Sequence, residues 1–172
     1  MARTVNGARA WARGVLAPAV GDSASLDADL LLMHVLGLTR VEIVVQRERP
    51  LNDAETAAYE ALVARRARRE PVAYIVGARE FFGRRFAVNP DVLIPRPETE
   101  ILVEQALSLA PSGAAIFEVG VGSGALICSI LAERDDLHGA GNDICIRALR
   151  VARDNARCLG VSGRLLLFAG RG

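Results

Sequence analysis

One stretch near the middle of the chain combines the residue types and spacing that cofactor chemistry needs. Three glycines at alternate positions separate an apolar run from a helix-like run; the three parts are Ala114–Val119, then Gly120, Gly122 and Gly124, then Ala125–Arg134. Glycine lets the main chain turn sharply and lets a ligand approach closely, and a new helix offers unpaired N–H groups to anionic or polar atoms. The order of strand, tight turn and helix therefore predicts a site for a nucleotide-like cofactor.

The glycine pattern alone fits two cofactors. Gly120, Gly122 and Ala125 satisfy the G-x-G-x-x-G/A dinucleotide fingerprint, and Asp143 lies about 20 residues on, where an acid that binds a ribose belongs. Gly120, Gly122 and Gly124, preceded by Glu118, equally suit the first motif of S-adenosylmethionine (SAM) methyltransferases. A glycine-rich turn without a ligand is the third interpretation, and the surrounding order of elements disfavours it.

The residues after this turn predict the elements that would hold the site. A strand over His138–Asn142 ends at Asp143, a helix follows from about Cys145 to Leu159, and Arg164–Ala169 reads as a third strand. We therefore expect an α/β fold in which β-α-β-α-β forms the opening half of a doubly wound, Rossmann-like parallel sheet.

The first 70 residues predict a small helical bundle. Capping-box patterns open two helices, one beginning Thr39-Arg40-Val41-Glu42 and the other Asn52-Asp53-Ala54-Glu55. A weaker helix covers Thr4–Leu16. Another, Leu26–Leu36, has apolar residues at helical spacing, a cap from Ser25 or Asp27, and a stop at Gly37; its periodic residues are Leu26, Leu30, Met33 and Leu36.

The segment between bundle and sheet predicts a β-hairpin over Arg79–Ile94, with Gly83 and Asn89-Pro90 as breakers. A rigid stretch, Ile94–Glu100, then leads into a helix that runs to Leu109 and begins with Glu98 and Glu100. The expected domains are residues 1–70, a linker over 71–97, and a partial cofactor-binding domain over 98–172.

Composition excludes several classes of function. The net charge of +1 gives no reason to expect direct nucleic-acid binding, and no apolar run approaches the ~20 residues of a membrane span. The three cysteines, Cys128, Cys145 and Cys158, have neither disulfide nor metal spacing and read as buried small hydrophobes. We expect a cytoplasmic protein without a metal. His34 is expected to be half buried, and the arginines of residues 65–69 to form a solvated face.

Four segments, taken together, resemble the release factor glutamine methyltransferases, the HemK/PrmC group: Pro71–Gly77, Glu80–Gly83, Val92–Glu100 and Glu118–Gly124. The resemblance runs in register from about Leu26 to Asn155. The glycine motif is shared by a whole superfamily, whereas Ile94–Glu100 is much more diagnostic. The resemblance favours SAM over NAD as the cofactor.

This resemblance implies a helical domain that recognises class 1 peptide chain release factors, a hairpin linker and a Rossmann-like methyltransferase domain. The family transfers a methyl group from SAM to the glutamine side chain of the Gly-Gly-Gln motif. Asp143 would accept hydrogen bonds from the ribose hydroxyls, and Glu118 would orient the glycine turn or the amino group of SAM. The residues that would wrap the methionine part of SAM are Gly120, Val121, Gly122, Ser123 and Gly124.

The sequence departs from the family pattern in two ways. The family orients the glutamine amide with an Asn-Pro-Pro-Tyr motif, which these 172 residues lack, so no catalytic residue is assigned. The acid that the family places near the adenine is also missing, since Gly170-Arg171-Gly172 occupy that position and no acidic residue follows Asp154. We expect a truncated or frameshifted family member with weak or no methyl transfer and an uncovered apolar face on its sheet.

Three other functions remain open from the sequence. The chain could be a non-catalytic remnant that still binds release factors, or an NAD-dependent oxidoreductase. A nucleic-acid methyltransferase is a further alternative, because enzymes with Asn-Pro-Pro-Tyr motifs also act on DNA and RNA amines; the helical domain and the Ile94–Glu100 segment argue against it.

Overall fold

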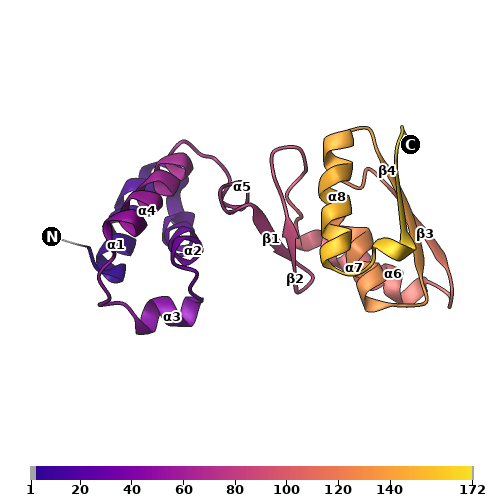
Figure 1. Cartoon of the computed structure of the whole chain (residues 1–172), viewed down its shortest axis with the longest axis horizontal. Coiled ribbons are helices and arrows are strands. Elements are labelled where there is room, and N and C mark those ends of the chain that lie inside the picture. Colours follow the sequence, from indigo (N-terminus) through magenta and orange to yellow (C-terminus); the bar gives the residue numbers. More distant parts are fainter. Residues whose placement is uncertain (1–2, 172) are drawn as a thin grey trace. The chain divides into compact units, whose positions relative to one another are not determined.

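The computed structural model of the chain describes residues 3–171, which form two compact units, one ending at Val76 and the other starting at Gly77 (Figure 1). Unit 1 is helical, and unit 2 contains a hairpin, a parallel sheet and three longer helices. Within the described range, no helix has both the length and the apolar character needed to cross a membrane.

Unit 1 confirms the expected helical bundle. Its elements are α1 (Val5–Val20), η1 (Gly21–Ser23), α2 (Ala24–Leu36), α3 (Arg40–Val45), α4 (Asp53–Ala67) and the short α5 (Val72–Val76). The sequence did not predict α5, because one helical turn after a proline gives no periodic signal. Helices α1, α2 and α4 pack against one another around a core that includes Leu16, Leu32 and Tyr59.

Both predicted capping boxes are confirmed. The Thr39 hydroxyl accepts from the Glu42 amide, and the Glu42 carboxylate accepts from the Thr39 amide. Asn52 and Glu55 form the same reciprocal pair at the start of α4. These motifs are local, so the sequence around each helix start is sufficient to specify them.

The predicted apolar face of α2 is half right, because Met33 and Leu36 pack partly buried against the core but the other two residues do not. Leu26 and Leu30 are 46% and 36% exposed, while the buried face contains Ala28, Leu31 and Leu32. Small residues there allow close packing against α1, whose buried positions also include alanines. The proposed caps are wrong, because Ser25 and Asp27 lie inside the helix; the Gly37 stop is confirmed, with the left-handed conformation of a C-cap.

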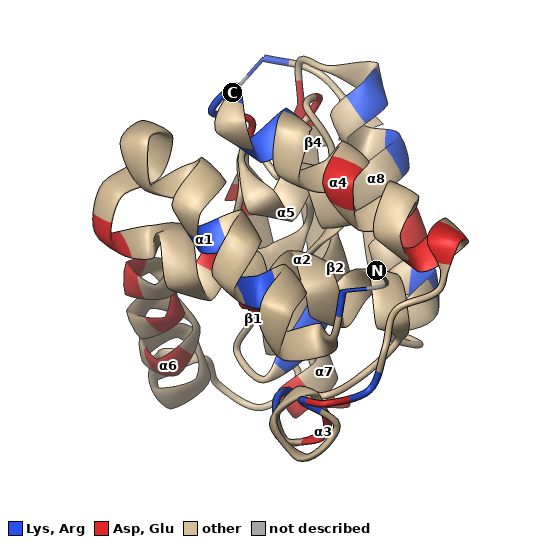
Figure 2. Ribbon diagram, turned by 90° about the vertical axis from the view of Figure 1, so that its left-hand side faces the viewer, with Lys and Arg blue, Asp and Glu red and all other residues tan. Residues whose placement is uncertain are grey.

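Unit 2 begins with the predicted hairpin and continues through the predicted alternation of strands and helices. Its elements are β1 (Ala78–Phe81), β2 (Arg84–Ala87), η2 (Pro97–Thr99), α6 (Glu100–Leu109), β3 (Ala115–Val119), α7 (Ala125–Glu133), β4 (His138–Asp143), α8 (Ile146–Cys158), η3 (Ser162–Arg164) and β5 (Leu165–Ala169). Figure 2 shows acidic residues on successive turns of α6. The expected α/β fold class is confirmed.

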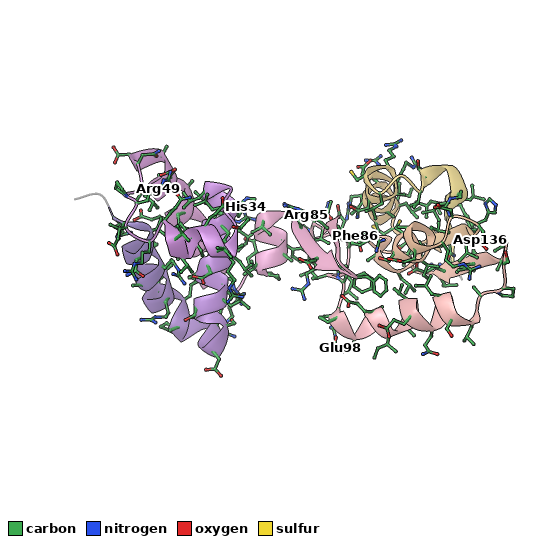
Figure 3. The ribbon with its side chains drawn as sticks, turned by 90° about the horizontal axis from the view of Figure 1, so that it is seen from below. His34, Arg49, Arg85, Phe86, Glu98 and Asp136 are labelled. Atoms are coloured by element: carbon green, nitrogen blue, oxygen red, sulfur yellow. The ribbon has the colours of Figure 1, made fainter. Side chains whose placement is uncertain are left out.

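The hairpin is anchored inside unit 2 by one side of β2 and by its turn. Phe86 is fully buried beside Phe81, whereas its neighbour Arg85 is exposed (Figure 3). The main-chain amide of Phe82, in the turn, donates to the carboxylate of Glu100 at the start of α6, 2.9 Å away. The acid that the sequence placed at a helix start therefore also holds the hairpin turn.

Strands β3, β4 and β5 form a parallel sheet in the order β3-β4-β5, so β3 and β5 are its edges. One face carries Ile116, Leu165 and Leu167, which pack on the unit 2 core. The other face is uncovered within residues 3–171 and exposes large apolar side chains, including the stacked pair Phe117 and Phe168. This confirms the expected uncovered apolar face and exposed edges.

Three smaller expectations are corrected or refined. His34 is exposed and not half buried. Among the cysteines, Cys128 is buried as expected, but Cys158 is exposed. Of the basic residues at the end of α4, Arg65 binds Glu70 and Arg66 binds Asp27, so part of the predicted solvated face is engaged in ion pairs.

Candidate functional site

The glycine turn between β3 and α7 has the geometry that the sequence predicts. Gly120, Gly122 and Gly124 all have positive φ, at 74°, 55° and 78°, a region that side chains with a Cβ rarely adopt. The amides of Gly120 and Val121 both donate to the Asn142 carbonyl, at 2.9 and 3.0 Å, which ties the start of the turn to the end of β4. A Cβ on Gly120 would meet no atom within 4 Å, so one side of the turn faces open space.

Asp143 stands directly beside this turn. One carboxylate oxygen accepts from the Gly122 amide at 2.9 Å, and the other accepts from the Cys145 amide at 2.8 Å. A carboxylate has about four lone-pair sites, so each oxygen keeps acceptor capacity for a further donor. The structure thus brings together the acid and the glycines that the sequence places 21 residues apart.

Glu118 caps helix α7 from the preceding strand. Gly124, at the N-cap position, has no side chain to accept from the first turn, and the Glu118 carboxylate instead accepts from the Ile127 amide at 3.2 Å. Burial raises the pKa of Glu118 to about 7; the Ile127 hydrogen bond opposes this rise, and the negative charge of Asp143 adds to it. With its pKa near neutrality, Glu118 would shift toward its ionised form when a cation lies nearby.

The start of α7 presents unpaired main-chain donors. Within residues 3–171, the amides of Ser123, Ala125 and Leu126 have no hydrogen-bond partner. Ser123 and Ala125 are buried residues. Unpaired N–H groups at a helix N-terminus attract a carboxylate or phosphate group. The turn therefore offers donors for an anionic group next to the acceptors of Asp143 and Glu118.

Gly124 and a glycine outside the turn, Gly141, allow the turn to pack closely. A Cβ on Gly141 would lie 2.4 Å from Val121 Cγ2 and 3.1 Å from the Glu118 carbonyl oxygen. A Cβ on Gly124 would lie 3.2 Å from Ala152 Cβ. Val121 is buried as a result, and it serves as a packing residue beneath the turn.

Asn155 on α8 is a supporting residue that sequence reasoning missed. Its side-chain nitrogen donates to the Ser123 carbonyl at 2.8 Å and to the Ala87 carbonyl at 3.0 Å, and its side-chain oxygen accepts from the Ala87 amide at 2.8 Å. The residue is only 3% exposed. A signal was present: Asn155 falls on the helix face occupied by Ala148 and Ala152, where a buried amide requires a partner.

Two cavities of the structure lie away from this turn. One of about 270 Å³ lies between α1 and α2, and one of about 310 Å³ lies beside α8 and β5. Neither includes a residue of the glycine turn, so hydrogen-bonding geometry, and not enclosure, identifies the candidate site. Within the described chain, no group of three or more His, Cys, Asp or Glu residues is arranged to hold a metal ion.

Comparisons with known proteins identify relatives of this chain. Residues 7–77 match the family described as PrmC N-terminal domain. The release factor glutamine methyltransferase of Nitratidesulfovibrio vulgaris is 46% identical over 168 residues, which is 97% of this chain and 57% of that protein. The one from Burkholderia pseudomallei is 49% identical over 137 residues, 78% of this chain and 48% of that protein.

Among solved structures, a SAM-dependent methyltransferase from Geobacter sulfurreducens in complex with S-adenosyl-L-homocysteine matches with 28% identity and a TM-score of 0.38, covering 44% of this chain and 29% of that one. The chain spans about half the length of the curated relatives that it matches. Over the part of these relatives that it spans, the chain is therefore similar to release factor glutamine methyltransferases, and its residues 7–77 match the PrmC N-terminal domain.

Proposed function

We propose that the chain serves in SAM-dependent methylation of the glutamine side-chain amide in the Gly-Gly-Gln motif of class 1 peptide chain release factors. In this proposal, unit 2 binds SAM beside the glycine turn and unit 1 docks the release factor. The relatives' names support the substrate. The hydrogen bond from the Gly122 amide to Asp143 supports binding of a ribose-bearing cofactor, because it fixes an acceptor at the edge of a turn with open space. The relatives' names, which are those of methyltransferases, favour SAM over NAD.

The residues at the turn fit the charges of SAM. The methionine carboxylate of SAM needs donors, and the unpaired amides of Ser123, Ala125 and Leu126 supply them. The ribose hydroxyls need acceptors, which Asp143 provides. The amino group and the sulfonium carry positive charge, and the buried Glu118 lies in the same site to balance it.

SAM, when bound, supplies a methyl group already activated by the positive sulfur. The contribution of the chain is therefore placement: a rigid glycine turn holds one end of the ligand, and Asp143 holds the ribose. The 172 residues contain no Asn-Pro-Pro-Tyr motif to orient the glutamine amide. The functions proposed for these residues are therefore binding of the cofactor and docking of the release factor.

Calorimetric titration of the chain with SAM, with S-adenosyl-L-homocysteine and with NAD tests the cofactor. We expect both sulfur ligands to bind and NAD to give no heat. Asp143→Asn should weaken SAM binding at least ~10-fold, about 1.4 kcal/mol, because the amide loses an acceptor that the ribose requires.

Asp154→Asn is the matched control. Asp154 is an exposed acid on α8 whose partner is Arg157, one helical turn away, and its substitution should leave the SAM affinity unchanged. NAD binding in place of SAM, or equal effects of the two substitutions, would contradict the assignment. Incubation with labelled SAM and a purified release factor then shows whether the chain transfers a methyl group or only binds.

A further inference from the structure

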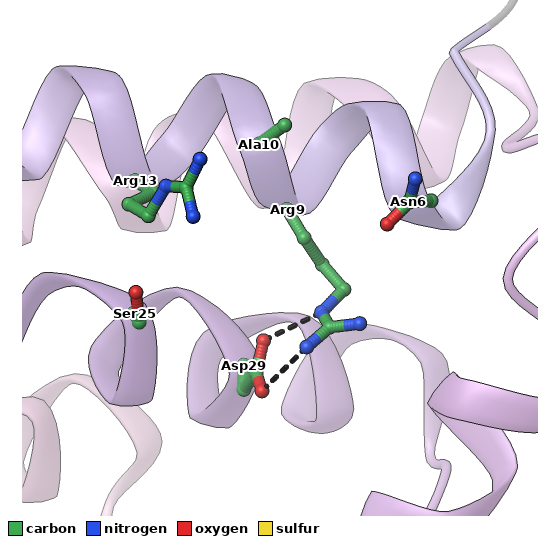
Figure 4. Close-up of a pocket in the computed structure, with 6 residues that line it drawn as sticks. All are labelled: Asn6, Arg9, Ala10, Arg13, Ser25 and Asp29. Carbon is green, nitrogen blue, oxygen red and sulfur yellow. Dashed lines mark hydrogen bonds and ion pairs between the residues drawn. The ribbon is translucent and has the colours of Figure 1, made fainter.

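A polar cavity of about 270 Å³ opens between α1 and α2 in unit 1, far in sequence from the glycine turn (Figure 4). Four of its lining residues come from α1 and two from α2: Asn6, Arg9, Ala10, Arg13, Ser25 and Asp29. None of these residues takes part in the cofactor site, and Ser25 alone among them was given a role from the sequence, as a helix cap.

Arg9 is held rigidly at the base of this cavity. Its Nε and Nη2 atoms donate to the two carboxylate oxygens of Asp29, at 2.6 and 2.9 Å. Asp29 is only 9% exposed, so the pair is a bidentate, largely buried bridge. Within residues 3–171 no hydrogen bond or ion pair uses Nη1 of Arg9, so this edge of the fixed guanidinium remains available to a ligand.

Arg13 lies one helical turn after Arg9 and faces the same cavity. It is exposed, and among residues 3–171 it has neither an ion pair nor a hydrogen bond. Since Asp29 offsets one of the two arginines, the cavity carries one net positive charge. That charge matches a carboxylate, whereas the nearby Asp29 disfavours a doubly charged phosphate.

The neutral residues of the cavity add donors, and its border is apolar. The side-chain amide of Asn6 and the Ser25 hydroxyl belong to exposed residues and have no hydrogen-bond partner within the described range. Leu26 and Leu30 directly follow Ser25 and Asp29, so they lie about 100° further around α2, and both are substantially exposed. An arginine pocket beside exposed leucines is typical of a surface that binds protein.

We propose that this cavity binds a carboxylate side chain of a protein partner, with Arg13 and the free face of Arg9 as its donors and with Leu26 and Leu30 packing on the flanking residues of that partner. If the proposed function holds, the partner is the release factor, and the cavity is the charged subsite of the docking surface. The identity of the partner thus rests on the proposed function, whereas the chemistry of the cavity does not.

Binding of a purified class 1 release factor to the full chain tests the docking role. Arg13→Glu should weaken binding at least ~10-fold through loss of one attractive pair and gain of one repulsive pair. Arg150→Glu, the same charge change at an exposed, unpaired arginine of α8, should change binding less than ~2-fold. If both variants bind like the original chain, the inference is overturned while the proposed function stands.

A small-molecule titration tests the cavity without the release factor. With butyrate, a monocarboxylate, as the probe at constant ionic strength, the side-chain NMR signals of Arg9 and Arg13 should shift saturably in the original chain and in Arg150→Glu, and not in Arg13→Glu. These shifts support a carboxylate site in the cavity even if the release factor does not bind. Failure of the release factor to bind would instead refute the docking role in the proposed function. Absence of shifts, or a stronger response to inorganic phosphate, overturns the carboxylate assignment.

Discussion

Replacing Asn155 by leucine should loosen the glycine turn and the hairpin together. The substitution keeps the number and branching of the side-chain heavy atoms and removes three hydrogen bonds, one to Ser123 and two to Ala87. A buried group left unpaired costs about 1–3 kcal/mol. Ser123 is buried and bears the full cost, whereas Ala87 is exposed and regains some hydrogen bonding from water, so we expect a loss of about 3 kcal/mol in total.

Hydrogen exchange followed by mass spectrometry measures this loss where it occurs. A change of about 3 kcal/mol should speed exchange about 100-fold in peptides from β2 and from residues 119–126. The single tryptophan, Trp11, lies in unit 1, so its fluorescence provides an internal control and its unfolding transition should not move. Arg150→Leu, an exposed change on α8, should alter exchange by less than a few fold. Unchanged exchange in both segments of Asn155→Leu would refute the reasoning.

Four further substitutions give distinct outcomes. Gly124→Ala forces a Cβ into a left-handed conformation with contacts of 3.2–3.3 Å and should destabilise α7 by about 2 kcal/mol, whereas Gly14→Ala, in open space within α1, should stabilise unit 1 by about 0.5–1 kcal/mol; hydrogen exchange reports both. The pKa of Glu118 is raised from 4.5 to about 7, so the folded chain binds the proton more tightly and loses stability as pH rises from about 4.5 to 7. Glu118→Gln should remove this loss, which is at most about 3 kcal/mol. Urea titrations give the free energy of unfolding at pH 5 and at pH 8. If this free energy decreases equally in both proteins between the two pH values, Glu118 is not the cause of the loss. Tyr59→Phe removes a buried hydroxyl that donates to a main-chain carbonyl of α2 at 2.9 Å, and it should lower the stability of unit 1 by about 1 kcal/mol, measured by Trp11 fluorescence.

The sequence predicted the elements whose causes are local. The capping boxes at Thr39 and Asn52 hold because each needs only residues within one turn of a helix. The glycine turn holds for the same reason, since positive φ at alternate positions selects glycine whatever surrounds it. Asp143 was predicted because a parallel strand that follows one crossover ends beside the first turn.

The failures concern burial that tertiary packing decides. Periodicity in α2 suggested a face with Leu26 and Leu30, but the helix turns its alanines and Leu31 and Leu32 to the core. Two overlapping apolar patterns were present in the same segment, and contact with α1 selected the one with smaller residues. The cavity beside Arg9 depends on this choice, because it requires Ser25 and Asp29 to face α1.

At the candidate site, too, a contact between residues far apart in sequence escaped prediction: the hydrogen bonds of Asn155 that support the glycine turn. The motif lies within a few consecutive residues, but Asn155 reaches it across 32 residues of sequence and reaches Ala87 across 68. Because one side-chain amide binds both, the hairpin and the turn should open as one unit when it is lost. Faster exchange in the hairpin alone would show that packing on Gly124 and Gly141 suffices to hold the turn, and the role assigned to Asn155 would then be confined to β2.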